Sequence, residues 1–415
     1  MYEAGKQNRQ RHELIPELVI ILLSTVINGN WGNYIRWILL IVLIAWRVIK
    51  RGGKIKIISM PGVFFYALFM VICVINGAVL LMKNNTTLWF FTRDIILTST
   101  YGLEWLLICN IVIIYKSNKR KMWQSVVTAS SMLTVFALLR SLPKLVEGIS
   151  SFSDFVNGMP TAQWTLAIGI ILFMFHPPEV NRYYFSRRID KLLLILEIVM
   201  ALLSFSRTFF VIFGSVLIVL ALNKINIINF LKYVIMFFVG IIVIYNLLPE
   251  VSLVFVSKVF NSFQEISASG NWNITAAVLN WRGYEVYCAK KTFSQYNSWQ
   301  MIFGKGFGAT IVADYSQLVT GEGQLPFLHN GYYTALIKGG LVGVGAYGLM
   351  FVVQIVRVIS NKRMHKFDRK MCVGMIIGLI LTSIVVQGVY FGSMYIIPWA
   401  IIAWNIMAES NLTEE

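Results

Sequence analysis

The sequence has 415 residues, of which 57% are hydrophobic and 13% are charged, whereas soluble domains carry roughly 25% charged and 45–50% apolar residues. A chain this poor in charge cannot cover itself with a polar surface, which excludes soluble domains, a disordered chain and a coiled coil. The net charge is +17, from 36 Lys and Arg against 19 Asp and Glu. On a soluble protein that surplus would suggest nucleic acid as a partner, but on a membrane protein it sets topology. We therefore expect one integral membrane domain over residues 1–415, with no nucleic-acid partner.

Apolar runs long enough to cross a bilayer, about 20 residues each, recur along the chain. They predict an all-α polytopic protein with about twelve spans, of which the second and eighth are short. The candidates are residues 14–30, 34–49, 61–82, 95–115, 122–142, 160–176, 190–205, 208–223, 229–248, 330–356, 371–388 and 392–408.

The basic residues divide unequally between the two sides that these spans define. If the amino terminus is cytoplasmic, 24 of the 36 Lys and Arg residues fall on the inner side, where every short loop is rich in them. Cytoplasmic loops carry this excess in membrane proteins. The pattern predicts an even number of spans with both termini cytoplasmic. Small residues four apart, Gly339 with Gly343 and Gly374 with Gly378, predict close helix packing.

Residues 249–328 form the one substantial hydrophilic segment, a large extracytoplasmic loop between the ninth and tenth spans. A structureless loop of that length would be unusual, so we expect a partly helical cap. Residues 276–292 read as a helix that carries Arg282 and Glu285 one turn apart. The three glycines in the run 304–308 predict a flexible turn.

Chemistry at the outer face has no ATP available and needs a substrate that arrives activated, such as a lipid-diphosphate-linked sugar. Cations would hold the diphosphate, and arginine suits it best because its planar fork binds two oxygens at once. Arg207 lies at the outer end of two spans and is either such a cation or a snorkelling interfacial arginine. Arg282 is a second candidate for binding the diphosphate, and the alternative is that it is solvated or pairs with Glu285. Arg93 adjoins Asp94, which favours a local ion pair.

A base must also take the proton from the attacking hydroxyl. His329 is the one histidine on the outer side, and the alternative for it is hydrogen bonding at the start of a helix, which Asn330 would cap. Glu104 and Lys338 lie within spans, where ionisable groups are costly and often functional. Glu104 is an alternative base or a carboxyl satisfied by a neighbouring helix. Lys338 either brings a cation to a headgroup cavity or snorkels.

Four short motifs, taken together, resemble the O-antigen polymerase and O-antigen ligase family. They are Ser204-Phe205-Ser206-Arg207-Thr208, Trp281-Arg282-Gly283-Tyr284, Phe303-Gly304-Lys305-Gly306-Phe307-Gly308 and His329-Asn330-Gly331-Tyr332-Tyr333. Their order, and a large outer loop before the last spans, also match. The motif-level similarity covers roughly residues 200–350, whereas the first half of the chain agrees only in layout.

The resemblance implies a GT-C-like glycosyltransferase of the bacterial cytoplasmic membrane that needs neither a cofactor nor a metal. Its substrate would be an undecaprenyl-diphosphate-linked oligosaccharide, and a flippase and a chain-length-determining protein would be its partners. Arg207 and Arg282 would bind the donor diphosphate, and His329 would assist the acceptor; the residues expected around the substrate are Lys305, Lys338, Asn330, Tyr333 and Glu104. A polymerase is favoured, while a ligase uses the same motifs and a flippase or exporter would also explain the spans.

Overall fold

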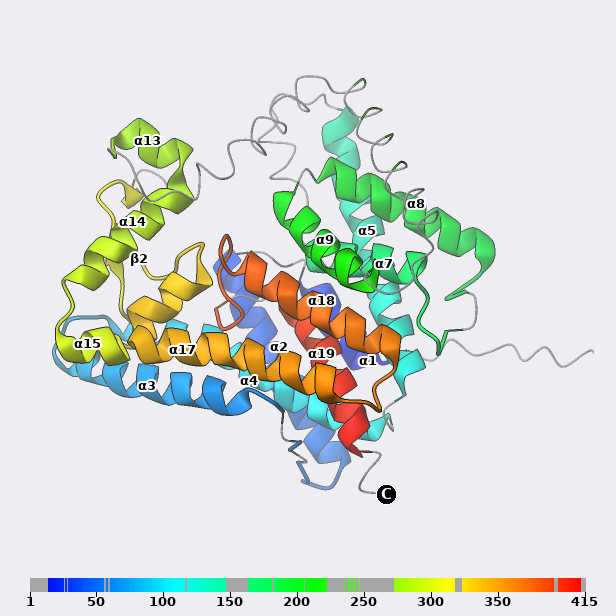
Figure 1. Cartoon of the computed structure of the whole chain (residues 1–415), viewed down its shortest axis with the longest axis horizontal. Helices are drawn as coiled ribbons and strands as arrows, with labels where there is room; N and C mark the ends of the chain where they lie inside the picture. The colour runs from blue at the N-terminus through cyan, green and yellow to red at the C-terminus, as the bar shows by residue number, and fades with distance from the viewer. Residues whose placement is uncertain are drawn as a thin grey trace, which may run out of the picture.

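The computed structural model shows a mostly helical protein with one two-stranded sheet in its described part (Figure 1). The description covers residues 14–25, 27, 29–55, 57–58, 60–115, 118–146, 163–180, 183–204, 206–221, 272–317, 323–391 and 395–411, with the single positions 235, 239, 242 and 246. Most of the predicted span 229–248 and the first part of the predicted outer loop therefore lie outside the described residues.

The helices of the membrane body follow the predicted spans closely. They are α1 (Pro16–Ser24), α2 (Gly29–Lys50), α3 (Val63–Met82), α4 (Leu88–Ile114), α5 (Lys119–Val146), α7 (Gln163–Met174), α8 (Arg187–Leu203), α9 (Arg207–Ala221), α17 (Gly331–Ser360), α18 (Lys366–Thr382) and α19 (Ile396–Asn411). Each predicted span other than 229–248 overlaps one of these helices, while the count of about twelve membrane crossings stays a prediction.

Five of these helices are long and apolar enough to cross a bilayer, namely α2, α3, α4, α5 and α17. The membrane character of the chain is thereby confirmed. The lengths differ in detail from the prediction, because α2 has 22 residues and is not short, whereas α1 has only 9. Pro16 fixes the start of α1. Near its end, the hydroxyls of Ser24 and Thr25 donate to the carbonyls of Ile21 and Leu22.

Small residues set the packing of α9 on α18. A Cβ at Gly374 would lie 2.7 Å from the Val216 Cα, and one at Gly378 would lie 2.7 Å from the Ser215 Oγ. The predicted close approach at this glycine pair is confirmed. Because Gly378 faces Ser215 and Lys370 reaches the Leu220 carbonyl, the two helices run antiparallel. The first residues of α9 therefore lie at the end of α18 where α18 stops.

Helix α17 runs antiparallel to α3 and to α18. Gly339 packs on Phe69 of α3, and Gly343 contacts the same ring, which confirms the second predicted glycine pair. At its start, the Gly331 amide donates to the Ser383 carbonyl just after α18. One end of the bundle thus gathers the end of α3, the starts of α4 and α17, and the end of α18.

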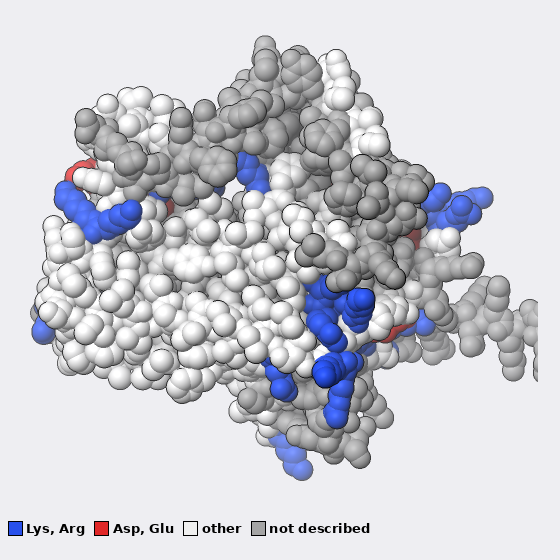
Figure 2. Space-filling view, in the orientation of Figure 1, with Lys and Arg blue, Asp and Glu red and all other residues white. Residues whose placement is uncertain are grey.

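Charge is distributed on the surface as a membrane protein requires. Figure 2 shows a broad uncharged surface over α3 and α17, with basic side chains at its margins. Exposed Lys362, Arg363 and Lys366 lie at the turn from α17 to α18, and exposed Lys290 and Lys291 lie on α14. The assignment of these two groups to the inner and outer sides of the membrane stays a prediction.

The described part of the segment predicted as the outer loop forms a small module beside α17, which we name the outer module after that prediction (Figure 1). It contains α13 (Ile274–Leu279), α14 (Trp281–Ser294), α15 (Ser298–Phe303) and the antiparallel strands β1 (Ile311–Val312) and β2 (Gln324–Leu325). The predicted helix over 276–292 is present but broken at Asn280. Tyr284, Cys288, Ile311 and Leu325 share a small core with Ile337 of α17, so the module is anchored to the membrane body.

Candidate functional site

The glycine-rich run after α15 is a tightly packed wedge between α3 and α17. Gly304, Gly306 and Gly308 all have positive φ, and a Cβ at Gly306 would lie 2.0 Å from the Gly77 nitrogen. The Phe307 amide donates to the Cys73 carbonyl at 2.8 Å. The expectation of a flexible turn is therefore wrong: the glycines serve close backbone approach as well as turning.

Helix α17 is kinked where this wedge meets it. Gly340 has φ 64° inside the helix, and a kink frees carbonyls of the preceding turn. The freed oxygens of Ile337 and Lys338 accept the amides of Lys305 at 3.1 Å and Gly306 at 2.8 Å. The outer module thus completes the backbone hydrogen bonding of a broken membrane helix, as buried backbone groups require.

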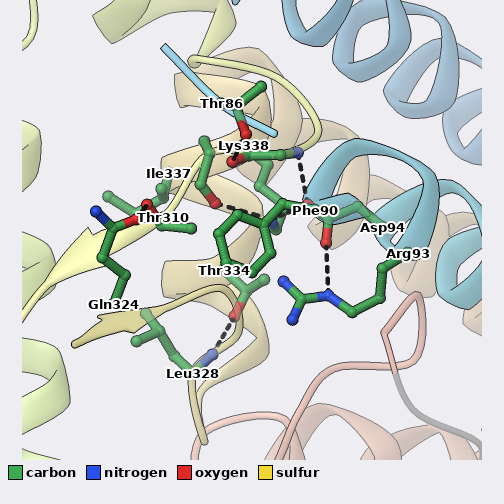
Figure 3. Close-up of polar contacts among 12 residues, drawn as sticks. Thr86, Phe90, Arg93, Asp94, Thr310, Gln324, Leu328, Thr334, Ile337 and Lys338 are labelled. Carbon is green, nitrogen blue, oxygen red and sulfur yellow. Dashed lines mark hydrogen bonds and ion pairs between the residues drawn. The ribbon is translucent and has the colours of Figure 1, made fainter. Parts of the chain in front are cut away.

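Lys338 of α17 forms a fully buried ion pair with Asp94 of α4 (Figure 3). Its Nζ also donates to the Ala309 carbonyl at 3.2 Å, and Asp94 Oδ2 accepts the Gly308 amide at 2.7 Å. Because the Lys338 side chain is completely buried, the snorkelling interpretation is wrong. The pair ties α4, α17 and the glycine wedge together, so Lys338 is held by protein acceptors.

Arg93 lies beside this pair but does not share its hydrogen bonds. Its Nε is 3.7 Å from Asp94 Oδ1, which is an ion-pair contact without a hydrogen bond. The guanidinium carbon lies 4.8 Å from the ring centre of Phe90 and 5.3 Å from that of Phe327. The expected ion pair with Asp94 is therefore present, but it leaves the hydrogen bonding of the Arg93 guanidinium unexplained.

His329 is held by a buried carboxylate of the outer module. Its Nδ1 lies 2.9 Å from Glu285 Oε1, and its backbone amide donates to Glu285 Oε2 at 2.7 Å. The Glu285 side chain is 2% exposed, while the His329 side chain is 48% exposed. If the carboxylate is ionised it can only accept, so the imidazole would donate from Nδ1 and, in its neutral form, would present the Nε2 lone pair.

The start of α17 positions His329 from the other side. Asn330 caps the helix by accepting the Tyr333 amide at 3.1 Å, and its own Nδ2 donates to the Ile384 carbonyl at 2.9 Å. The predicted cap is confirmed. The Leu328 amide donates to Thr334 Oγ1 at 3.2 Å, a contact drawn in Figure 3. Hydrogen bonds on both sides of His329 thus fix its backbone, with Tyr333 one turn below.

The two candidate arginines approach this end of the bundle from different elements. Arg282 is one turn before Glu285 on α14 and is half-buried, which puts it on the same side of that helix as the histidine contact. Arg207 begins α9, eight residues before Ser215, or about 12 Å along the helix. Ser215 faces Gly378, and α9 and α18 run antiparallel. Arg207 therefore lies at the same height in the bundle as the segment just after α18, whose Ile384 carbonyl accepts from Asn330.

Two further candidates, Lys305 and Glu104, have contacts with residues other than His329. Lys305 is half-buried, with its Nζ 4.5 Å from the centre of the Tyr296 ring, and burial lowers the pKa of this lysine. Glu104 is buried within α4, and Arg36 of α2 is the cation whose charge acts on it. Arg36 itself donates to the carbonyls of Gly32 and Ile27. Glu104 therefore belongs to a separate network on the α2 side of α4.

Sequence reasoning missed the carboxylates that organise the site. Glu285 was considered as a partner for Arg282, but both of its oxygens receive hydrogen bonds from His329. Asp94 was considered with its neighbour Arg93, but it accepts from residues more than 200 positions away. Both carboxylates lie in helical or apolar segments, which indicates burial. Because a buried carboxylate requires hydrogen-bond or charge partners, this position was the one sign in the sequence of their role.

Comparisons with known proteins add nothing to these observations: no protein-family model matches the sequence, and a search of proteins with curated functions found no match.

Proposed function

We propose that this protein is a membrane glycosyltransferase that joins undecaprenyl-diphosphate-linked oligosaccharide repeat units at the outer face of the bacterial cytoplasmic membrane. The observation that carries the proposal is the pair formed by Glu285 and His329. A histidine whose Nδ1 is fixed by a buried carboxylate has the orientation and tautomer of a general base. The helical membrane body supports a substrate that is itself anchored in lipid.

The proposed reaction is a single displacement at the anomeric carbon of the donor sugar. The acceptor hydroxyl attacks that carbon, its proton passes to His329 Nε2, and the bond from carbon to the diphosphate oxygen breaks. A new glycosidic bond forms, and the lipid diphosphate leaves with the electron pair. Glu285 stabilises the imidazolium that results, because its carboxylate lies 2.9 Å from Nδ1.

Cations at the same end of the bundle would stabilise the leaving diphosphate. Arg282 lies one helical turn from Glu285, and Arg207 lies level with the segment that Asn330 contacts. Arginine binds two phosphate oxygens at once and keeps its charge in a partly buried site. Polymerisation requires the acceptor hydroxyl to belong to a second repeat unit. A flippase would deliver the repeat units to the outer face, and a chain-length-determining protein would control the length of the product.

Reconstitution tests the proposal directly. The purified protein in liposomes, supplied with a defined undecaprenyl-diphosphate-linked repeat unit, should give a ladder of longer products. A single transfer to an added glycolipid acceptor would indicate the ligase reaction, and movement of the unmodified substrate across the bilayer would indicate a flippase. Lys290→Ala is a matched control for Arg282→Ala, because Lys290 is an exposed cation on the same helix.

A further inference from the structure

Arg93 carries hydrogen-bond donors that the described protein does not satisfy. Its side chain is 7% exposed, yet Nε and Nη2 have no hydrogen-bond partner among the described residues. Nearly all buried polar groups in native proteins are paired, and an unpaired charged donor carries the full cost of its desolvation. These two nitrogens therefore need an acceptor from outside the described chain.

Asp94 does not meet that need. Its Oδ2 accepts from Lys338 and Gly308, and its Oδ1 lies 3.7 Å from Arg93 Nε, beyond hydrogen-bonding distance. Arg93, Lys338 and Asp94 are all buried, so the cluster holds two cations and one anion. Among the described residues one positive charge is left over, and it resides on the arginine, because the carboxylate hydrogen-bonds to the lysine and lies at a longer distance from the arginine. The missing acceptor is therefore an anion.

The shape of the site specifies the kind of anion. Nε and Nη2 lie on one edge of the guanidinium, and this edge binds two oxygens of a single phosphate or carboxylate group. The half-buried rings of Phe90 and Phe327 lie near the guanidinium, at 4.8 and 5.3 Å, and leave donors in its plane. Arg93 lies in the second turn of α4 at the end of the bundle that carries His329, where lipid headgroups would lie.

We propose that Arg93 binds the phosphate of a lipid headgroup through the Nε and Nη2 edge of its guanidinium. Phe327 packs against Arg93 and lies two residues before His329, so an anion at this edge lies next to the segment that carries the histidine. The site follows from the unpaired donors and the charge balance. Only the choice of a prenyl diphosphate as the first probe rests on the proposed function.

Binding measurements on the purified full-length protein in nanodiscs of a zwitterionic lipid test this site. The probes are farnesyl diphosphate, farnesol as the phosphate-free analogue, inorganic diphosphate and phosphatidylglycerol. The variants are Arg93→Gln, Arg93→Lys, which keeps the charge but loses the fork, and Arg140→Gln, which removes an exposed arginine of α5 as a control. Isothermal calorimetry gives the Kd, and the thermal midpoint of the ligand-free protein is measured in parallel.

We expect farnesyl diphosphate to bind wild type and Arg140→Gln equally, and Arg93→Gln about tenfold to a hundredfold more weakly, as the loss of charge-assisted hydrogen bonds predicts. Arg93→Lys should lie between them, and farnesol should not bind. Equal affinity of inorganic diphosphate would identify a free phosphate site, and competition by phosphatidylglycerol would identify bulk lipid as the source. Equal affinities for wild type and Arg93→Gln, or no binding of any phosphate-bearing probe, would overturn the proposal.

The ligand-free proteins provide a second, independent readout. If the donors are unpaired, Arg93→Gln should fold with an unchanged or raised thermal midpoint. If Arg93 is only a structural partner of Asp94, the midpoint should fall and phosphate binding should stay as in wild type, which refutes the proposal. The outcome is separable from the proposed function, because a product ladder that depends on His329 can persist whether or not Arg93 binds phosphate.

Discussion

Replacing Lys338 by methionine is the most informative test of how the outer module is held. The change removes the ammonium that pairs with Asp94 and donates to the Ala309 carbonyl, while keeping an unbranched apolar side chain that is one atom shorter. Both partners of the pair are completely buried. Removing one member of a buried ion pair costs about 3–5 kcal/mol, because the remaining charge is left without compensation.

The local geometry places the expected loss toward the lower end of that range. Asp94 keeps the Gly308 amide at 2.7 Å, and Arg93 is 3.7 Å away and can turn toward the carboxylate. We therefore expect Lys338→Met to lower the free energy of unfolding by about 3 kcal/mol. The same turn of Arg93 would weaken phosphate binding, since the guanidinium edge would then be occupied by Asp94.

Unfolding by SDS in mixed micelles, followed by circular dichroism, measures this loss. Lys291→Met is the control, because Lys291 is exposed on α14, and it should change the free energy of unfolding by less than about 0.5 kcal/mol. The double variant Asp94→Asn with Lys338→Met should recover most of the stability, since it leaves no unpaired charge. A Lys338→Met protein as stable as wild type would refute the assigned pairing.

Three further changes test other contacts. Glu285→Gln should slow product formation about 10²- to 10⁴-fold with little change in stability, because an amide no longer fixes a proton on Nδ1 of His329. An unchanged rate in the liposome assay would show that Glu285 has no part in the reaction. Gly306→Ala should fail to fold or should unfold at a much lower temperature, since its Cβ would lie 2.0 Å from the Gly77 nitrogen. Gly348→Ala, with open space around it, should leave stability unchanged or raise it. Equal thermal midpoints for the two variants would contradict the tight packing of the glycine run between α3 and α17. Arg282→Ala should abolish long products while Lys290→Ala does not, as product gels would show, and normal chain lengths in Arg282→Ala would exclude it from diphosphate binding.

Features that depend on local sequence were predictable. Apolar runs located the helices, and glycine pairs such as Gly374 with Gly378 located a close contact, because both patterns follow from the period of one helix. Asn330 was recognised as a cap for the same reason, since a cap involves residues within one turn. The division of basic residues between the two sides of the membrane stays a prediction.

Features that depend on distant pairing were not predictable. Asp94 has a neighbouring arginine in sequence, and nothing local indicates that Lys338, at a separation of 244 residues, takes its carboxylate. Glu285 is one turn from Arg282 but hydrogen-bonds to His329, at a separation of 44. The glycines of 304–308 were likewise only partly predictable. A glycine indicates that positive φ is allowed, but it does not indicate which helices the segment packs against.

The central claim is that a Glu285-oriented His329 transfers lipid-linked glycans, and product formation by the wild type and by a His329 variant tests it most directly. Wild-type protein in liposomes with the defined repeat unit should form a ladder of longer products. His329→Ala should lose that activity while remaining folded, as the exposed position of its side chain allows. A ladder from His329→Ala at the wild-type rate would contradict this role of the histidine.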